Sequence, residues 1–80
     1  QLNISPNPSD GRRITTQLNF EPLNHAKIQV SDLTGTIVSE TIVSGVEVDV
    51  EFSTQLKPGI YLVTYYAQGF KHTERLLVRN

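Results

Sequence analysis

Few side chains in this sequence have the types and spacing that catalysis or metal binding requires. The two histidines, His25 and His72, have no second ligand or general base at a regular spacing. No serine lies in a G-x-S-x-G context, and the absence of cysteine removes thiol nucleophiles, Cys-ligated zinc and disulfides. The sequence therefore does not predict an enzyme, and we expect no catalytic residue, no metal and no cofactor.

Three carboxylates alternate with valines in one segment, as Glu47, Asp49 and Glu51. Alternate residues of a strand point to the same face and lie about 7 Å apart. A calcium site needs oxygen ligands that converge from a loop around one ion. The pattern therefore predicts a solvated strand face and no tight calcium site.

Aromatic side chains concentrate in one late segment, as Tyr61, Tyr65, Tyr66 and Phe70. Exposed rings could form a sugar-binding platform, but there is no Trp, and packing in a core is the more usual role of such rings. Tyr61 follows the turn sequence Lys-Pro-Gly, which is typical of a tyrosine corner. We expect its hydroxyl to bind backbone a few residues upstream.

Basic residues alternate along the last segment, where Lys71, Arg75 and Arg79 share one face with Leu77. Positive charges on an edge strand discourage aggregation, which is one interpretation. The other is a docking face, because a terminal strand at a sheet edge could also offer unpaired N–H and C=O groups to an added strand. We expect these four residues to form the docking site.

The chain length and charge exclude several classes of protein. Eighty residues make one domain at most, and 7 Lys+Arg against 8 Asp+Glu leave a net charge of −1. A dedicated nucleic-acid-binding protein would carry a basic excess. The apolar runs are far shorter than the roughly 20 residues of a membrane-spanning helix. The chain begins with Gln and shows no signal peptide, so we expect a fragment of a longer secreted protein, forming one C-terminal domain over residues 1–80.

The composition favours an all-β fold, since Val, Ile and Thr number 8, 6 and 8 while Ala numbers 2. Turn signals separate short segments of β-forming residues, and the segment 60–67 is apolar on both faces, as in a central strand. About seven antiparallel strands in 80 residues fit an immunoglobulin-like β-sandwich. The predicted strands are 2–5, 12–20, 26–32, 36–43, 46–52, 60–67 and 71–79.

Alternation of apolar and polar residues along these strands also predicts the core. The residues that we expect inside are Ile14, Leu18, Phe20, Ile28, Val30, Val48, Val50, Leu62, Leu76 and Val78.

Four motifs in order resemble the type A C-terminal sorting domain of proteins exported by the type IX (Por) secretion system of Bacteroidetes. Residues 4–11 resemble its opening PNP…G signature, 28–35 its V-x-D-x-x-G turn, 56–63 its L-x-x-G-x-Y-x-V segment, and 76–80 its terminal apolar-then-basic strand. The motif positions are Pro6, Asn7, Pro8, Gly11, Asp32, Gly35, Leu56, Gly59, Tyr61 and Val63.

The resemblance implies an immunoglobulin-like domain at the C-terminus of a larger cargo protein that reaches the cell surface or is secreted, via the periplasm and outer membrane. It implies two partners besides the N-terminal cargo domain, an outer-membrane translocon and a sortase-like peptidase that removes the domain and anchors the cargo. Nucleic acid and small-molecule substrates are not expected.

Each motif also has a role in the fold, which the residues themselves suggest. Pro6 and Pro8 end the first strand, Asp32 can bind backbone two residues on, and Gly11 and Gly35 can adopt a positive φ.

Two other interpretations remain open from the residues alone. A fibronectin type III-like or carbohydrate-binding accessory module of a secreted glycosidase would carry a similar tyrosine corner, although it usually has a buried Trp. A small enzyme is the other. Position in the full-length protein separates a sorting domain from an accessory module, because a sorting domain ends its protein whereas an accessory module can lie anywhere.

Overall fold

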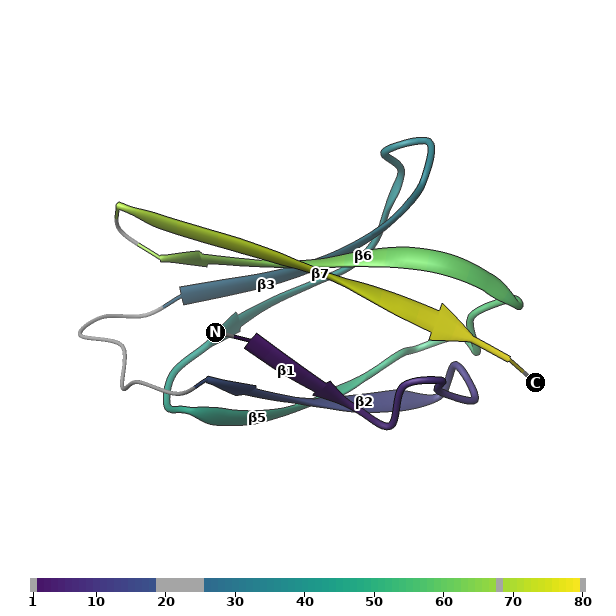
Figure 1. The fold of residues 1–80 in the computed structure, drawn as a ribbon, viewed down its shortest axis with the longest axis horizontal. Helices are drawn as coiled ribbons and strands as arrows, with labels where there is room; N and C mark the ends of the chain where they lie inside the picture. Colours follow the sequence, from purple (N-terminus) through teal and green to yellow (C-terminus); the bar gives the residue numbers. More distant parts are fainter. Residues whose placement is uncertain (1, 19–25, 68, 80) are drawn as a thin grey trace.

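The protein is an all-β sandwich in a computed structural model that describes residues 2–18, 26–67 and 69–79 (Figure 1). The described residues form seven strands and no helix. This part of the chain therefore contains no helix that is long and apolar enough to cross a membrane. The observed strands equal the predicted ranges or differ from them by one residue at one or both ends, except that residues 19–20 of the second lie outside the described part. They are β1 (Leu2–Ser5), β2 (Arg13–Leu18), β3 (Ala26–Asp32), β4 (Ile37–Val43), β5 (Glu47–Glu51), β6 (Gly59–Ala67) and β7 (Phe70–Val78).

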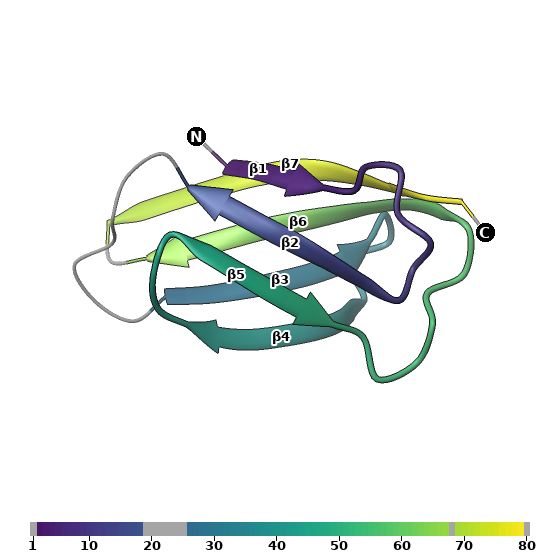
Figure 2. The ribbon, with the colours of Figure 1, turned by 90° about the horizontal axis from the view of Figure 1, so that it is seen from below.

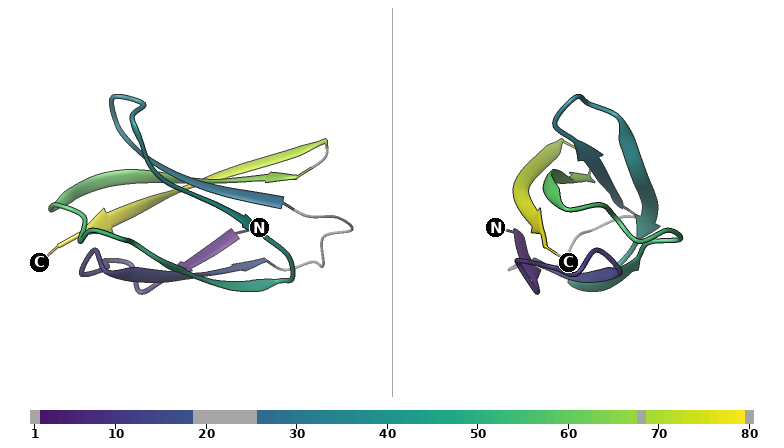
Figure 3. Two further views of the ribbon diagram at one scale, coloured as in Figure 1. Left: turned by 180° about the vertical axis from the view of Figure 1, so that it is seen from behind. Right: turned by 90° about the vertical axis from the view of Figure 1, so that its right-hand side faces the viewer.

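The strands form two antiparallel sheets that face each other. One sheet has the order β1-β2-β5 and the other β4-β3-β6-β7. Figure 2 shows the narrower sheet lying across the wider one, and Figure 3 shows the two layers from behind and from one end. The central position of β6 confirms the expectation from its apolar character on both faces.

The core lies between the two sheets and contains side chains from both. Of the predicted core residues, seven are buried: Ile14, Leu18, Ile28, Val30, Val50, Leu76 and Val78. Val48 is half-buried and packs against this core, and Phe20 lies outside the described residues. Tyr65 and Val63 are also fully buried, on the inner face of β6.

The prediction for Leu62 is wrong, because this side chain lies half-buried on the outer face of the sheet. Neighbours in a strand point to opposite faces, and Tyr61 and Val63 on either side are the buried ones. A strand that is apolar on both faces does not reveal which of its two sets of residues points inward.

The β3–β4 hairpin projects beyond the sandwich at one end and turns at Asp32, as the sequence predicted (Figures 1 and 3). Its carboxylate accepts hydrogen bonds from the Thr34 hydroxyl at 2.6 Å, the Thr34 amide at 2.9 Å and the Thr36 amide at 3.0 Å. The bond from the Thr34 hydroxyl is the main reason why the pKa of Asp32 is lowered. Gly35 completes the turn with a φ of 93°.

Candidate docking surface

The predicted docking residues lie on the outer face of β7, at one edge of the four-stranded sheet. Leu76 and Val78 point into the core, so the alternate residues point outward. Lys71, Arg75 and Arg79 are exposed, and Leu77 is half-buried. The fold therefore places all four along one face of one strand and its exit.

Apolar side chains of β6 extend this face, and the sequence did not predict their part in it. Ile60 is paired with Leu77, and Leu62 is paired with Arg75. We call the surface formed by Ile60, Leu62, Arg75, Leu77 and Arg79 the outer patch. The sequence could not predict this surface, because it depends on the pairing of β6 with β7. The sequence instead predicted that Leu62 lies in the core.

The far end of the same face is polar and aromatic. The Lys71 ammonium lies 5.7 Å from the centroid of the Tyr66 ring, and the Lys27 ammonium lies 5.1 Å from it. Exposed cation–π contacts of this kind stabilise the fold by about 0.5–1 kcal/mol. Lys71 is therefore already engaged within the domain, whereas Arg75 and Arg79 point to solvent.

The Pro-Asn-Pro-Ser segment after β1 covers the edge of β7. The Asn7 side-chain nitrogen donates to the Arg75 carbonyl at 2.9 Å, and its oxygen accepts from the Leu77 amide at 3.0 Å. The Ser9 amide then donates to the Leu77 carbonyl, and the Arg79 amide donates to the Ser9 carbonyl, both at 2.8 Å. The edge of β7 between residues 75 and 79 is therefore occupied by this segment.

This arrangement corrects one expectation. The last strand does lie at a sheet edge, as expected. The prediction that its edge offers unpaired backbone groups is wrong at residues 75–79, because Asn7 and Ser9 bind them. Only the outward-facing side chains of this half of β7 remain for a partner.

Ser9 and Gly11 fix this segment against the rest of the domain. The buried Ser9 hydroxyl accepts the Gly11 amide at 3.0 Å and donates to the Arg13 carbonyl at 3.2 Å. Gly11 has a φ of 85°, and its carbonyl accepts the Leu56 amide at 2.9 Å. A Cβ at Gly11 would lie 2.6 Å from the Leu56 carbonyl oxygen, so the first and third sequence motifs pack directly against each other.

The remaining motif positions have structural roles as well. The buried Tyr61 donates its hydroxyl to the Lys57 carbonyl at 2.8 Å, which confirms the tyrosine corner. Gly59 adopts a φ of 154° at the start of β6, and Leu56 and Val63 are buried. β1 ends at Ser5, directly before the first proline of the Pro-Asn-Pro-Ser segment.

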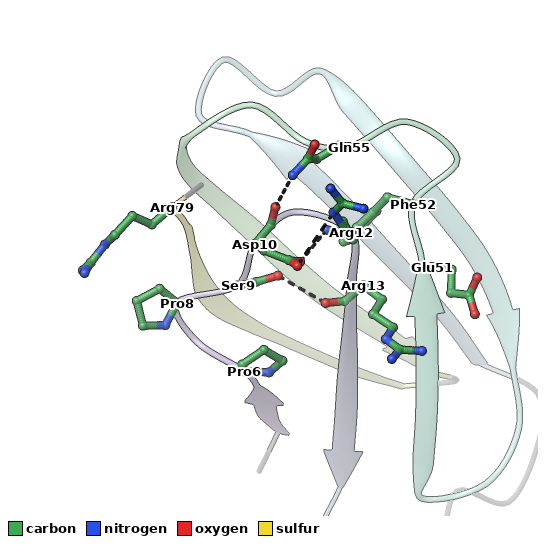
Figure 4. A pocket seen from close by; sticks show the side chains of 10 residues that line it. All are labelled: Pro6, Pro8, Ser9, Asp10, Arg12, Arg13, Glu51, Phe52, Gln55 and Arg79. Atoms are coloured by element: carbon green, nitrogen blue, oxygen red, sulfur yellow. Dashed lines mark hydrogen bonds and ion pairs between the residues drawn. The ribbon is translucent and has the colours of Figure 1, made fainter.

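An open hollow of about 1030 Å³ lies beside the Pro-Asn-Pro-Ser segment and has three arginines in its lining, Arg12, Arg13 and Arg79. Figure 4 shows that they do not converge, because Arg79 points away from the other two. Arg12 lies 3.9 Å from the Asp10 carboxylate, and Arg13 stands opposite Glu51 in the register of β2 and β5. The hollow is therefore not arranged to bind a single anion.

Side chains that could bind a metal ion do not form a cluster within the described part of the chain. His72 is half-buried and lies 3.1 Å from the Glu74 carboxylate, while His25 is outside the described residues. Across residues 2–18, 26–67 and 69–79, no three His, Asp or Glu side chains are placed to hold a metal ion. The acidic face of β5 is exposed, as predicted, and Asp49 on it accepts a hydrogen bond from the Thr15 hydroxyl at 2.7 Å.

Comparison with known families identifies the domain. The family described as the secretion system C-terminal sorting domain matches residues 3–79, which include all four motifs. The chain belongs to this family. The resemblance to the C-terminal sorting domain of type IX secretion is confirmed, and the alternative of a fibronectin-like or carbohydrate-binding module is not supported. A search of curated proteins finds no match.

Membership defines the role of the sorting domain. It is the C-terminal sorting signal for type IX secretion, so its cargo is exported and is secreted or attached to the surface. Its partner is the type IX secretion machinery.

Proposed function

We propose that the type IX machinery recognises the outer patch, together with Lys71, at the outer-membrane translocon. The observation that carries this proposal is the combination of exposed Arg75 and Arg79 with Leu77 and the apolar residues beside them on β6. Arg is enriched in protein interfaces, and apolar side chains supply area that is buried on binding. The complementary surface on the translocon would carry carboxylates around an apolar centre.

The sealed edge of β7 supports recognition through side chains. Asn7 and Ser9 hold the strand through four hydrogen bonds, so Arg75, Leu77 and Arg79 are displayed from a fixed backbone. A surface that is already ordered loses less conformational entropy when a partner binds. Sealing would thus favour binding to the outer patch and would exclude strand addition at this end.

We also propose the wider context of the domain. It follows an N-terminal cargo domain in a type A member of this family from Bacteroidetes. After translocation a sortase-like peptidase removes it and anchors the cargo. The order of the four motifs supports this assignment, and the role of the domain in it is recognition, with no catalysis of its own.

An export assay with a charge-reversed domain tests the docking surface. Residues 1–80 are fused behind a reporter with a signal peptide, in a host with type IX secretion. Arg75→Glu with Arg79→Glu should leave the fold nearly intact, because exposed charges contribute only about 0–1 kcal/mol each. We expect the reporter to remain in the periplasm.

Two controls make this assay specific. Arg12→Glu with Lys57→Glu changes the net charge by the same amount at exposed positions outside the outer patch, and it should be exported normally. Leu76→Ala removes a buried side chain, should cost about 2–5 kcal/mol and should block export by unfolding the domain. Normal export of the folded Arg75→Glu, Arg79→Glu variant would contradict the proposal and leave the basic residues as a protection against aggregation.

A further inference from the structure

The strand β4 forms the other edge of the four-stranded sheet, far from β7. It pairs with β3 on one side only. Three of its apolar side chains are exposed: Ile37 by 52%, Val38 by 40% and Ile42 by 68%. Exposed apolar side chains on an unpaired edge strand favour the addition of a further strand.

The other three edge strands carry features that prevent the addition of a further strand. β1 has only four residues and is followed by proline, and β5 presents Glu47, Asp49 and Glu51. β7 is basic, and Asn7 and Ser9 cover its edge at residues 75–79. Short length, proline, charge and covering are the usual protections of sheet edges. β4 has no Lys, Arg or Pro, and its single charged residue is Glu40.

The register shows which backbone groups of β4 face the open side. Residues along a strand point their N–H and C=O groups alternately to its two sides. Leu77 points these groups away from β6, because Asn7 and Ser9 bind them. The same alternation can be followed from β7 through the paired residues of β6 and β3 to β4. The backbone N–H and C=O groups of Thr41 point toward β3, whereas those of Glu40 and Ile42 point to the open side of β4.

A hollow of about 420 Å³ lies next to the start of this strand. Val38, Phe52, Leu56 and Tyr61 provide its apolar lining, together with Asp32 and Lys57. It opens between the β4 side of one sheet and the segment that follows β5. An added strand along β4 would place an inward-facing apolar side chain beside this hollow.

The charge around β4 indicates what kind of strand would bind along its open edge. β4 carries Glu40, and β5, the edge strand of the other sheet that lies beside it in Figure 2, carries Glu47, Asp49 and Glu51, whereas neither strand has a Lys or Arg. Lys27 lies 3.5 Å from Glu40, and Lys57 lines the hollow, while the three carboxylates of β5 have no described ion pair. A second copy paired through β4 would bring two acidic flanks together, which is unfavourable. A strand that carries Lys or Arg between apolar residues is complementary.

We infer that the open edge of β4 binds an extended segment of a partner protein in which apolar residues alternate with Lys or Arg, as an added strand. Backbone bonds to Glu40 and Ile42 would set its position, and the hollow beside Val38 would receive one apolar side chain. This surface is distinct from the outer patch, so the inference does not depend on the proposed docking function.

The test uses the isotope-labelled 80-residue chain and a short, end-blocked synthetic peptide of alternating lysine and valine. NMR follows the backbone amides during titration, and hydrogen exchange is measured at saturation. We expect the largest shifts at β4 and an exchange rate of the Glu40 and Ile42 amides that falls about tenfold or more. Shifts centred on β5 or β7 would overturn the inference.

Two variants separate strand addition from simple charge attraction. Ile42→Lys adds a positive charge on the β4 edge, and Leu33→Lys adds the same charge at the hairpin tip, where Leu33 is 64% exposed. We expect Ile42→Lys to weaken peptide binding about tenfold or more and Leu33→Lys to change it less than threefold, as screened surface charges do. Equal loss in both variants, or equal binding of a glutamate–valine peptide, would overturn the inference. Sedimentation that showed a dimer of the free chain lost in Ile42→Lys would assign the edge to a second copy instead.

Discussion

Asn7 and Leu77 are 70 positions apart, yet the Asn7 side-chain oxygen accepts the Leu77 amide at 3.0 Å. The nitrogen of the same side chain donates to the Arg75 carbonyl at 2.9 Å. One amide side chain thus supplies both the donor and the acceptor that a neighbouring strand would supply to β7. Asn is one of the two residue types whose side chain carries both groups on a planar amide.

Replacement of Asn7 tests this relationship. Asn7→Ala should lower the free energy of unfolding by about 1 kcal/mol, because two hydrogen bonds are lost at an exposed edge where water can replace them. Exchange of the Leu77 amide should become faster. Asn3→Ala, at an exposed position on β1, is the matched control and should leave Leu77 unaffected. An unchanged Leu77 exchange rate in Asn7→Ala would contradict the role of Asn7.

Two glycines with similar backbone angles should differ greatly in their tolerance of alanine. Gly45 has a φ of 95° with open space around it, so Gly45→Ala should cost about 1–2 kcal/mol of backbone strain. Gly11→Ala adds the overlap with the Leu56 carbonyl and should cost about 2–5 kcal/mol. Chemical denaturation measures both values, and equal costs would show that the contact between the first and third motifs relaxes easily.

Two buried tyrosines on β6 form a natural pair for measuring the tyrosine corner. The Tyr61 hydroxyl binds the Lys57 carbonyl, whereas the buried Tyr65 hydroxyl has no hydrogen-bond partner among the described residues. Tyr61→Phe should destabilise the domain by about 1–2 kcal/mol, since the carbonyl loses its donor. Tyr65→Phe should be neutral or stabilising, because it removes a buried polar group without a partner. Thermal unfolding compares the two, and the reverse order would contradict the corner.

The Asp32 turn should make stability depend on pH in acid. Hydrogen bonds, first from the Thr34 side chain, lower the pKa of Asp32 below its usual value of 3.8. A group whose pKa is lowered on folding stabilises the folded state above its unfolded pKa, and this contribution is lost as the pH falls through the folded pKa. The stability difference between the wild type and Asp32→Asn should therefore be constant near neutral pH and shrink below about pH 4. Denaturation curves at several pH values would measure it, and a difference that grows in acid would contradict this assignment.

Local patterns in the sequence account for much of this fold. Alternation predicted the seven strands and the burial of Ile14, Val50 and Leu76, because these features depend on neighbouring residues in the chain. The face of Leu62 could not be predicted, since its strand is apolar on both sides and the answer depends on how the sheets pack. The covering of β7 by Asn7 could not be predicted either, because it joins the two ends of the chain.

The separation of Asn7 and Leu77 by 70 positions in the sequence has a consequence for biosynthesis. Asn7 leaves the ribosome long before Leu77, and at about 5–20 residues per second the interval is roughly 4–14 s. During that time the first motif and most of the core lack the strand that completes them. A chain that stops before Leu77 would lack this closure. The domain therefore completes its native fold only after both of its ends have been synthesised, so a folded domain reports that translation has passed through β7.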